Sequence, residues 1–408
     1  MLIYIKLAWR NIFRNKRRTF IAGLAIGIGL AALIYVDALI LGMEKNMIDS
    51  ATSSFMGEGQ IHEKDFRQEY AVDKTIVKHR ELIDSLENDP RVLDLSPRVM
   101  TLAMATSPAN VHAVTMVGID PEQEKDLSEI DDVIQKGSYL EGADPHDIII
   151  GSKLAEILEV GMGDRLVLTA SEAGTGNLSQ DLFRVSGIYH FNVRELDRSF
   201  AFIRIDKAQG MLGLGDRIHE IALDLKDPNI ARDSGHPFWA EYSTEGNEAI
   251  GWAEILPSLD MAFKLSEFST FIVAIILFGV IALGIINTLF MSLHERMFEF
   301  GVLRAVGTRP FAMGRLIIFE AAALSVIAIF LGILLGYIVT YIFSKVGIDY
   351  RGIEFAGATI RNMLFPILTV SQFIKYPFWV FVFTTLIALY PARFAAKMKP
   401  AEAMRKSF

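Results

Sequence analysis

The amino-acid sequence predicts a membrane protein with four transmembrane α-helices and a large external α+β domain inserted between helices 1 and 2. Its composition is mixed, because 51% of the 408 residues are hydrophobic and 22% are charged. Such a composition suits neither a soluble protein nor a chain that lies wholly in the bilayer. The charges are also segregated: residues 43–268 hold 41 acidic residues against 21 Lys and Arg, whereas the rest of the chain holds 7 against 19.

Four apolar stretches carry the transmembrane prediction, because a helix needs about 20 residues to cross a bilayer. They are residues 19–42, 269–293, 314–344 and 376–392. We expect the first to be a retained anchor, since its apolar core exceeds the usual ~7–15 residues of a signal peptide and no A-x-A-like cleavage site follows it. The fourth is the shortest, and Pro377 and Pro391 bracket it.

Lys and Arg at the ends of these stretches predict the topology, because short basic segments stay on the cytoplasmic side. The leader 1–18 has six basic residues and no acidic one, and the connector 294–313 and the tail 393–408 are also rich in Lys and Arg. Both termini are therefore predicted to be cytoplasmic, with residues 43–268 and the short segment 345–375 outside. The leader also has an apolar helical face, so we expect it to lie on the inner leaflet. That face comprises Leu2, Ile5, Trp9, Ile12 and Phe13.

The acidic insert has the pattern of an α+β domain. Runs rich in β-branched and aromatic residues alternate with amphipathic helical runs. The strand-like runs are 147–151, 164–170, 182–191, 199–205 and 218–225, and the helical ones include 77–88 and 151–160. The length suits one large or two small subdomains. We expect the last part of the insert to return to the membrane as a helix continuous with the second span.

Motifs that mark catalytic, cofactor or metal sites are missing from the sequence. The chain has no cysteine and its eight histidines are scattered, so we expect neither thiolate chemistry nor a metal site. No P-loop, G-x-S-x-G or H-E-x-x-H pattern occurs. The basic residues lie at the ends of spans and not on a soluble face, which argues against nucleic-acid binding. We therefore expect no enzyme active site in this chain.

The predicted spans contain two carboxylates and two stripes of small residues. Asp37 lies near the outer end of the first span and Glu320 in the first turns of the third. Each suits either an interfacial position or a functional role. The stripes let helices approach closely, either within the chain or against a partner subunit. They are Gly23, Gly27 and Ala31 in the first span, and Gly332 and Gly336 in the third.

The connector "HERMFEFGVLRAVGTRP", residues 294–310, predicts a short amphipathic helix. Gly301 permits close approach, Gly307 can end the helix in a left-handed cap, and Pro310 can begin the next helix. Apolar residues extend over two turns between charged ones: Met297, Phe300, Leu303, Ala305 and Val306. Such a helix either serves as a plain connector or docks into a groove of another protein.

Residues 296–336 resemble the hallmark of the FtsX-like/MacB-type ABC transporter permeases, an R-x-x-E-x-G-x-L-R-A-x-G run followed by a span with an early Glu and later glycines. The leader "LAWRNIFRNKRRTF", the tail "PARFAAKMKPAEAMR" and the order of the spans resemble the same family. The size and the external domain look most like the permeases of lipoprotein-releasing (Lol-type) complexes.

That resemblance implies a permease subunit of the cell inner membrane that dimerises with a same or homologous permease. The dimer would bind two copies of a separate cytoplasmic ABC ATPase, which alone binds ATP-Mg. Lipoproteins would be extracted from the outer leaflet of the inner membrane and passed to a periplasmic carrier. Two alternatives remain: an FtsX-like transmitter that controls a cell-wall hydrolase, and MacB-like efflux of a toxic compound or peptide. By the same resemblance, the ATPase-coupling helix comprises Arg296, Glu299, Gly301, Leu303, Arg304 and Gly307. To these we add Phe300 as an apolar plug.

Overall fold

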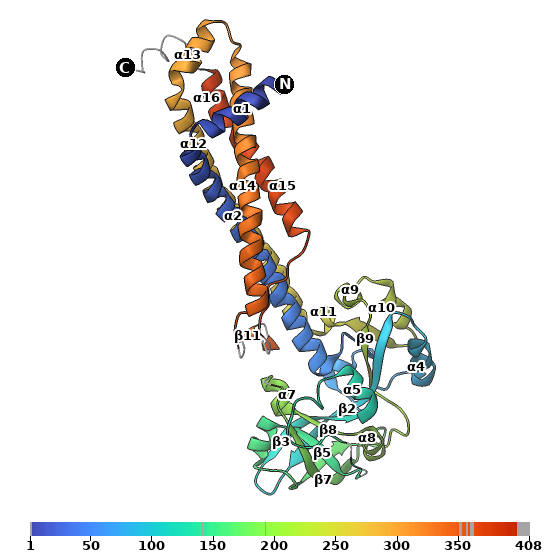
Figure 1. Ribbon diagram of the computed structural model, residues 1–408. Helices are drawn as coiled ribbons and strands as arrows, with labels where there is room; N and C mark the ends of the chain where they lie inside the picture. The colour runs from blue at the N-terminus through green and yellow to red at the C-terminus, as the bar shows by residue number, and fades with distance from the viewer. Residues whose placement is uncertain are drawn as a thin grey trace. The chain divides into compact units, whose positions relative to one another are not determined.

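The structure is a computed structural model that describes residues 2–140, 142, 144–191, 193–350, 353–355, 358–359 and 363–397 (Figure 1). The chain divides into two compact units. The helical unit comprises Met1–Lys45, Phe263–Asp349 and Met363–Phe408, and the sheet unit comprises Asn46–Ala262 and Tyr350–Asn362.

Long helices make up the helical unit. They are α1 (Leu2–Arg14), α2 (Lys16–Ala51), α12 (Pro257–Glu295), α13 (Met297–Ala305), α14 (Pro310–Val346), α15 (Gln372–Ile387) and α16 (Leu389–Ala396). Among the described residues, four stretches are long and apolar enough to cross a membrane: Lys16–Met56, Pro257–Glu295, Pro310–Val346 and Gln372–Ala396. The predicted four-span architecture is confirmed, and so is the continuity of the second span with the segment before it, since α12 begins at Pro257.

The last span differs from the sequence prediction. Pro377 and Pro391 do not bracket it, because they lie inside α15 and α16. The helix begins at Gln372 and is interrupted at Ala388. Pro391 has no N–H with which to bond the carbonyl of Ile387, four residues earlier, so the interruption falls where the helical hydrogen bond is lost.

The two stripes of small residues pack against each other inside the helical unit. A Cβ added to Gly332 would lie 2.9 Å from the carbonyl oxygen of Gly27, and one added to Gly336 would lie 3.3 Å from the Cα of Ala31. Gly23 faces Ile327 and Leu331 of the same helix α14. Packing within the chain therefore accounts for the stripes, and it holds α2 close to α14.

Ten strands of the described residues form the main sheet of the sheet unit. They are β1 (Gly59–Glu63), β2 (Val92–Thr106), β3 (Val111–Ile119), β4 (Ile134–Gly137), β5 (Asp147–Gly151), β6 (Arg165–Ser171), β7 (Leu178–Tyr189), β8 (Phe200–Arg204), β9 (Glu220–Leu225) and β10 (Asn247–Gly251). A small hairpin pairs β11 (Glu354–Phe355) with β12 (Ala358–Thr359). The predicted runs from 147 to 225 are all found as strands, from β5 to β9.

Six of the strands close into a ring. β2, β3, β8, β5, β7 and β6 pair in succession, and β6 pairs back with β2. The long strand β2 makes this possible, because Val92–Arg98 pairs with β9 while Ala103–Thr106 pairs with β6. β9, β1 and β10 continue the sheet from the first half of β2. The β3–β8 and β5–β7 pairs are parallel and the others antiparallel.

Short helices and a π-helical turn complete the sheet unit, which confirms the α+β class. They are η1 (Thr52–Met56), α3 (Phe66–Glu69), α4 (His79–Glu87), α5 (Pro121–Leu127), α6 (Ser152–Leu158), α7 (Arg194–Ser199), α8 (Ile205–Leu212), α9 (Pro228–Arg232), α10 (Pro237–Tyr242) and α11 (Trp252–Ile255). The core contains two ion pairs that share one arginine. Arg98 is fully buried and lies 2.6 Å from Glu124 and 3.0 Å from Glu220. Its guanidinium also covers the ring of Phe55, in η1, at 4.0 Å.

Candidate coupling site

The connector between α12 and α14 forms a separate short helix, α13, with a sharply defined end. Thr308 N–H donates to the carbonyl of Leu303 at 3.0 Å, and Gly307 N–H donates to that of Arg304 at 3.1 Å. This is the hydrogen-bond pattern of a Schellman cap. Gly307 has a φ of +99° and Pro310 is the first residue of α14. The predicted cap and helix start are thus confirmed.

A buried ion pair holds the start of α13 against α14. Arg296 Nη1 lies 2.5 Å from Glu320 Oε1, and the two side chains are only 10% and 7% exposed. Asn11 of α1 donates its side-chain amide to the same Glu320 oxygen at 2.7 Å. Glu320 therefore joins α1, α13 and α14. Glu320 is thus a buried polar contact within the helical unit, and both explanations from the sequence, an interfacial position and a functional role, stay predictions.

Two further ion pairs extend this network toward the surface. Arg14 lies 2.7 Å from Glu299, and Arg18 lies 2.6 Å from Glu295. Burial raises the pKa of Glu299, but hydrogen bonds from Arg14 and Arg296 outweigh it and bring the pKa below its ordinary value. The Arg14–Glu299 pair is solvent-exposed, so it contributes roughly 0–1 kcal/mol and weakens with salt. The buried Arg296–Glu320 pair is therefore the main polar attachment of α13.

Phe300 is not the exposed plug that we expected from the sequence. Its side chain is 1% exposed and belongs to the same buried cluster as Leu293, Met313 and Ile317. The guanidinium of Arg296 covers its ring at 5.0 Å. Phe300 and its neighbour Gly301 are the buried residues of α13, so this side of the helix faces the helical unit.

The exposed apolar side of α13 consists of other residues. Phe298, Val302 and Val306 recur every four positions and therefore share one face. All three are exposed, Val306 at 83%, and Leu303 is exposed beside them. The sequence contained this signal in the four-residue spacing, but Phe298 and Val302 were missed. We call Phe298, Val302, Leu303 and Val306 the α13 strip.

The leader helix also differs from its predicted orientation. Ile12 is buried in the helical unit together with Ala8, and α1 packs on α14. Trp9 and Phe13 are exposed, with ring centroids 5.3 Å apart. Ile12 therefore does not belong to the lipid-facing side of the helix. The side chains of Leu2 and Ile5 lie outside the described residues.

Asp37 joins α2 to α15 at the other end of the helical unit. It accepts a hydrogen bond from Gln372 Nε2 at 2.9 Å and one from the Tyr376 hydroxyl at 2.5 Å. The backbone N–H of Ile367 also donates to the carbonyl of Ala38. Asp37 therefore has a structural position, with partners that lie far away in the sequence.

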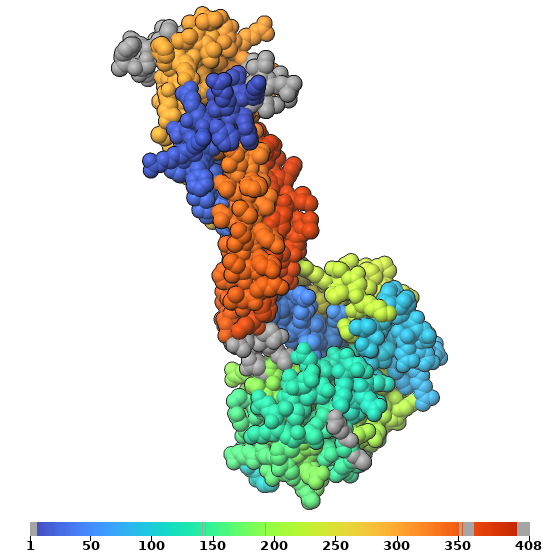
Figure 2. All heavy atoms as spheres, in the orientation of Figure 1, coloured from blue at the N-terminus to red at the C-terminus, as the bar shows by residue number. Residues whose placement is uncertain are grey.

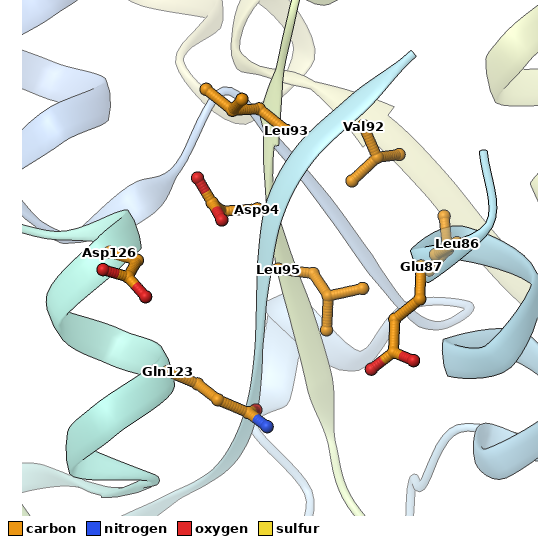
Figure 3. A pocket seen from close by; sticks show the side chains of 8 residues that line it. All are labelled: Leu86, Glu87, Val92, Leu93, Asp94, Leu95, Gln123 and Asp126. Carbon is orange, nitrogen blue, oxygen red and sulfur yellow. The ribbon is translucent and has the colours of Figure 1, made fainter. Parts of the chain in front are cut away.

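The sheet unit has a shallow hollow of about 230 Å³ between α4, the start of β2 and α5 (Figure 3). Glu87, Asp94 and Asp126 line it together with the apolar Leu93 and Leu95. Burial, followed by the nearby charge of Asp126, raises the pKa of Asp94. Across the described residues, no group of three His, Cys, Asp or Glu side chains is arranged to hold a metal ion.

Family models match both units. Residues 19–232 match the MacB-like periplasmic core domain, and residues 271–400 match the FtsX-like permease C-terminal domain. Four spans, an inserted core domain and an FtsX-like C-terminal part define a membrane permease. The chain belongs to the FtsX-like/MacB-type family of ABC transporter permeases, in agreement with the motif at residues 296–336.

Relatives align over nearly the whole chain. The lipoprotein-releasing system transmembrane protein LolC of Neisseria meningitidis is 26% identical, over 99% of this chain and 97% of that protein. LolE of Haemophilus influenzae is 22% identical, over 98% of each chain. The macrolide export ATP-binding/permease protein MacB of Psychrobacter cryohalolentis is 22% identical, over 100% of this chain and 60% of that protein. Among solved structures, the extracellular domain of the transporter YknZ is 14% identical, with a TM-score of 0.33, over 47% of this chain and 98% of that chain.

Proposed function

We propose that this chain is the permease subunit of an ABC transporter that releases lipoproteins from the outer leaflet of the inner membrane to a periplasmic carrier. The main support is the alignment with lipoprotein-releasing LolC and LolE over nearly their full lengths. In this proposal both termini are cytoplasmic and residues 43–268 are periplasmic. A second permease subunit, the same or homologous, completes the dimer. Two copies of a separate ABC ATPase bind and hydrolyse ATP.

The geometry of α13 supports a docking role in this machine. The α13 strip offers apolar side chains to a groove in the ATPase, as amphipathic helices do in other complexes. The Arg296–Glu320 pair and the buried ring of Phe300 attach α13 firmly to α14. Arg304 and Gly307 form the end of α13, and in this proposal they remain part of the ATPase-coupling helix, as the resemblance implies. In this proposal they set the angle at which the strip is presented.

Motion of α13 then has a route along the chain. α14 lies close to α2, because Gly332 leaves room for the backbone of Gly27. α2 is one continuous helix from Lys16 to Ala51. Its residues up to Lys45 belong to the helical unit and its last residues belong to the sheet unit, so this one helix runs through both. We propose that closure of the ATPase dimer moves α13 and α14, and that α2 carries the displacement to the periplasmic part of the chain.

Docking is tested by extracting the tagged chain gently from membranes and identifying the proteins that co-purify. Phe298→Asp and Val306→Asp place charges on the α13 strip and should abolish co-purification of an ABC ATPase. Leu178→Asp, an exposed apolar residue of the sheet unit, is the matched control and should leave the ATPase bound. If the strip variants retain the ATPase, or if the unaltered chain binds none, the docking proposal is wrong.

The substrate is tested separately, by depleting the chain and fractionating the membranes. Accumulation of mature lipoproteins in the inner membrane supports lipoprotein release. The match to the MacB-like core domain also supports MacB-like export as a second candidate. In that case depletion would sensitise cells to a toxic compound and leave lipoproteins correctly placed. The FtsX-like alternative would instead give a cell-wall defect.

A further inference from the structure

A groove of about 450 Å³ lies between the start of α2 and the end of α12, within the helical unit. One end of the groove is polar and basic, with Asn15, Arg17 and Arg18. The rest of its lining is mainly apolar, with Ile21, Ala22, Ala25 and Met291, and includes the polar Asn287 and Thr288 of α12. Gly284 of α12 also lines the groove, and a Cβ added there would meet nothing within 4 Å. The groove is therefore open space beside two helix backbones, with positive charge at one end.

The basic end has a cation available for a ligand. Arg18 is paired with Glu295 at 2.6 Å. Arg17 is exposed and has no ion-pair partner among the residues that the structure describes. Residues 1–36 contain no acidic residue at all. An unpaired Arg in such surroundings favours a phosphate, to which it can donate two parallel hydrogen bonds.

The surroundings of the groove are those of a membrane interface. Trp9 and Phe13 are exposed on α1, next to the basic and exposed Lys6 and Arg10. Figure 2 shows α1 and the start of α2, in blue, on the surface of the helical unit. Amphipathic helices with basic residues and exposed aromatic rings lie at the level of lipid headgroups. The ligand that combines a phosphate with an apolar tail at this level is a phospholipid.

We propose that this groove binds one anionic phospholipid of the cytoplasmic leaflet. Arg17 and the side-chain amide of Asn15 hold the phosphate, and an acyl chain lies along Ala25, Gly284 and Met291. The inference rests on the proposed topology, which places this end of α2 on the cytoplasmic side. It does not depend on the substrate or on ATPase docking.

Native mass spectrometry of the purified full-length chain in a neutral detergent measures the binding directly. The probes are dioleoyl phosphatidylglycerol and dioleoyl phosphatidylcholine, and we expect the anionic lipid to be retained preferentially, at one molecule per chain. Arg17→Gln should weaken phosphatidylglycerol binding about fivefold, the value of one basic contact at a membrane surface. Lys6→Gln, an equal loss of charge on α1 outside the groove, should change it less than about twofold. Equal effects of the two substitutions would mean diffuse attraction and overturn the site.

A second variant tests the apolar half of the groove without changing its charge. Gly284→Leu puts a side chain into the groove, and its Cβ would meet no atom within 4 Å. The chain should stay folded and lose the retained lipid. Retention of phosphatidylglycerol by Gly284→Leu at unchanged affinity would overturn the placement of the acyl chain.

The rival occupant is a second copy of this chain. The sequence has no cysteine, so Met291→Cys gives a single reactive thiol at the groove. Mild oxidation in native membranes should leave this variant monomeric if lipid fills the groove. Efficient disulfide-linked dimers would overturn the lipid proposal. Because neither readout uses the ATPase, lipid binding without ATPase co-purification would refute the docking proposal and leave the lipid site standing.

Discussion

Replacing Glu320 with alanine removes the carboxylate that holds Arg296 inside the helical unit. The Arg296 side chain is 10% exposed and its Nη1 lies 2.5 Å from Glu320. Its other partner, Glu299, lies 3.1 Å from its Nε and is far more exposed. Removing one member of a buried ion pair costs roughly 3–5 kcal/mol, because the other charge stays buried without compensation. Since Glu299 remains, we expect about 3 kcal/mol, or roughly a 150-fold loss in the folding equilibrium.

The assay is denaturant-induced unfolding of the full chain in detergent, followed by the helical circular dichroism signal. Arg14→Ala is the matched control, because it breaks the exposed Arg14–Glu299 pair and should cost at most about 1 kcal/mol. The double variant Arg296→Met/Glu320→Leu removes both charges and fills their volume. It should be much more stable than Glu320→Ala alone, since no buried charge is left unpaired.

Two results would refute this reasoning. If Glu320→Ala costs no more than Arg14→Ala, Arg296 does not depend on Glu320 for its burial. If the double variant is as unstable as Glu320→Ala, the loss comes from disrupted packing and not from an unpaired charge. Either result would mean that the Arg296–Glu320 ion pair does not hold α13 against α14, and would leave the buried ring of Phe300 as the attachment.

Three other predictions follow from separate contacts. Gly332→Leu forces α14 away from the Gly27 carbonyl oxygen, which lies 2.9 Å from the added Cβ. This overpacking should lower the free energy of unfolding by about 1–3 kcal/mol in the same denaturant assay, and an unchanged midpoint would contradict the close packing. Burial, and after it the nearby negative charge of Asp224, raises the pKa of Glu58 from 4.5 to about 7. In this pH range the folded state therefore keeps a proton that the unfolded chain releases, so the free energy of unfolding should fall as the pH rises from 4.5 to about 7. Glu58→Gln should flatten this pH dependence in tryptophan-monitored thermal unfolding, and an unaltered slope would exclude Glu58 as its source. Gly307→Ala strains a residue with a φ of +99° by about 1–2 kcal/mol. It should speed trypsin cleavage after Arg304, in the last turn of α13, severalfold, whereas an unchanged rate would show that the cap does not need glycine.

Features that depend on neighbouring residues were predictable from the sequence by itself. The four spans follow from stretches of apolar residues as long as a bilayer is thick. Strands such as β5 follow from short β-branched runs, and the end of α13 follows from a glycine placed before a proline. The family motif at residues 296–336 is likewise contiguous. Each of these signals lies within one element, where periodicity and chain stereochemistry decide the outcome.

The tertiary structure alone decided which side of each element is buried and which charges meet. Asn11 and Glu320 are 309 positions apart, and no pattern along the chain pairs them. The helical period of α13 allowed either Phe300 or Val306 to face outward, and contacts with α12 and α14 placed Phe300 inside. Closure of the ring through β6 likewise depends on β2 pairing with strands distant in the sequence. Burial and ion pairing depend on surfaces that folding brings together. The sequence pattern therefore indicates which side chains could be buried or paired, and only the tertiary contacts determine which of them are.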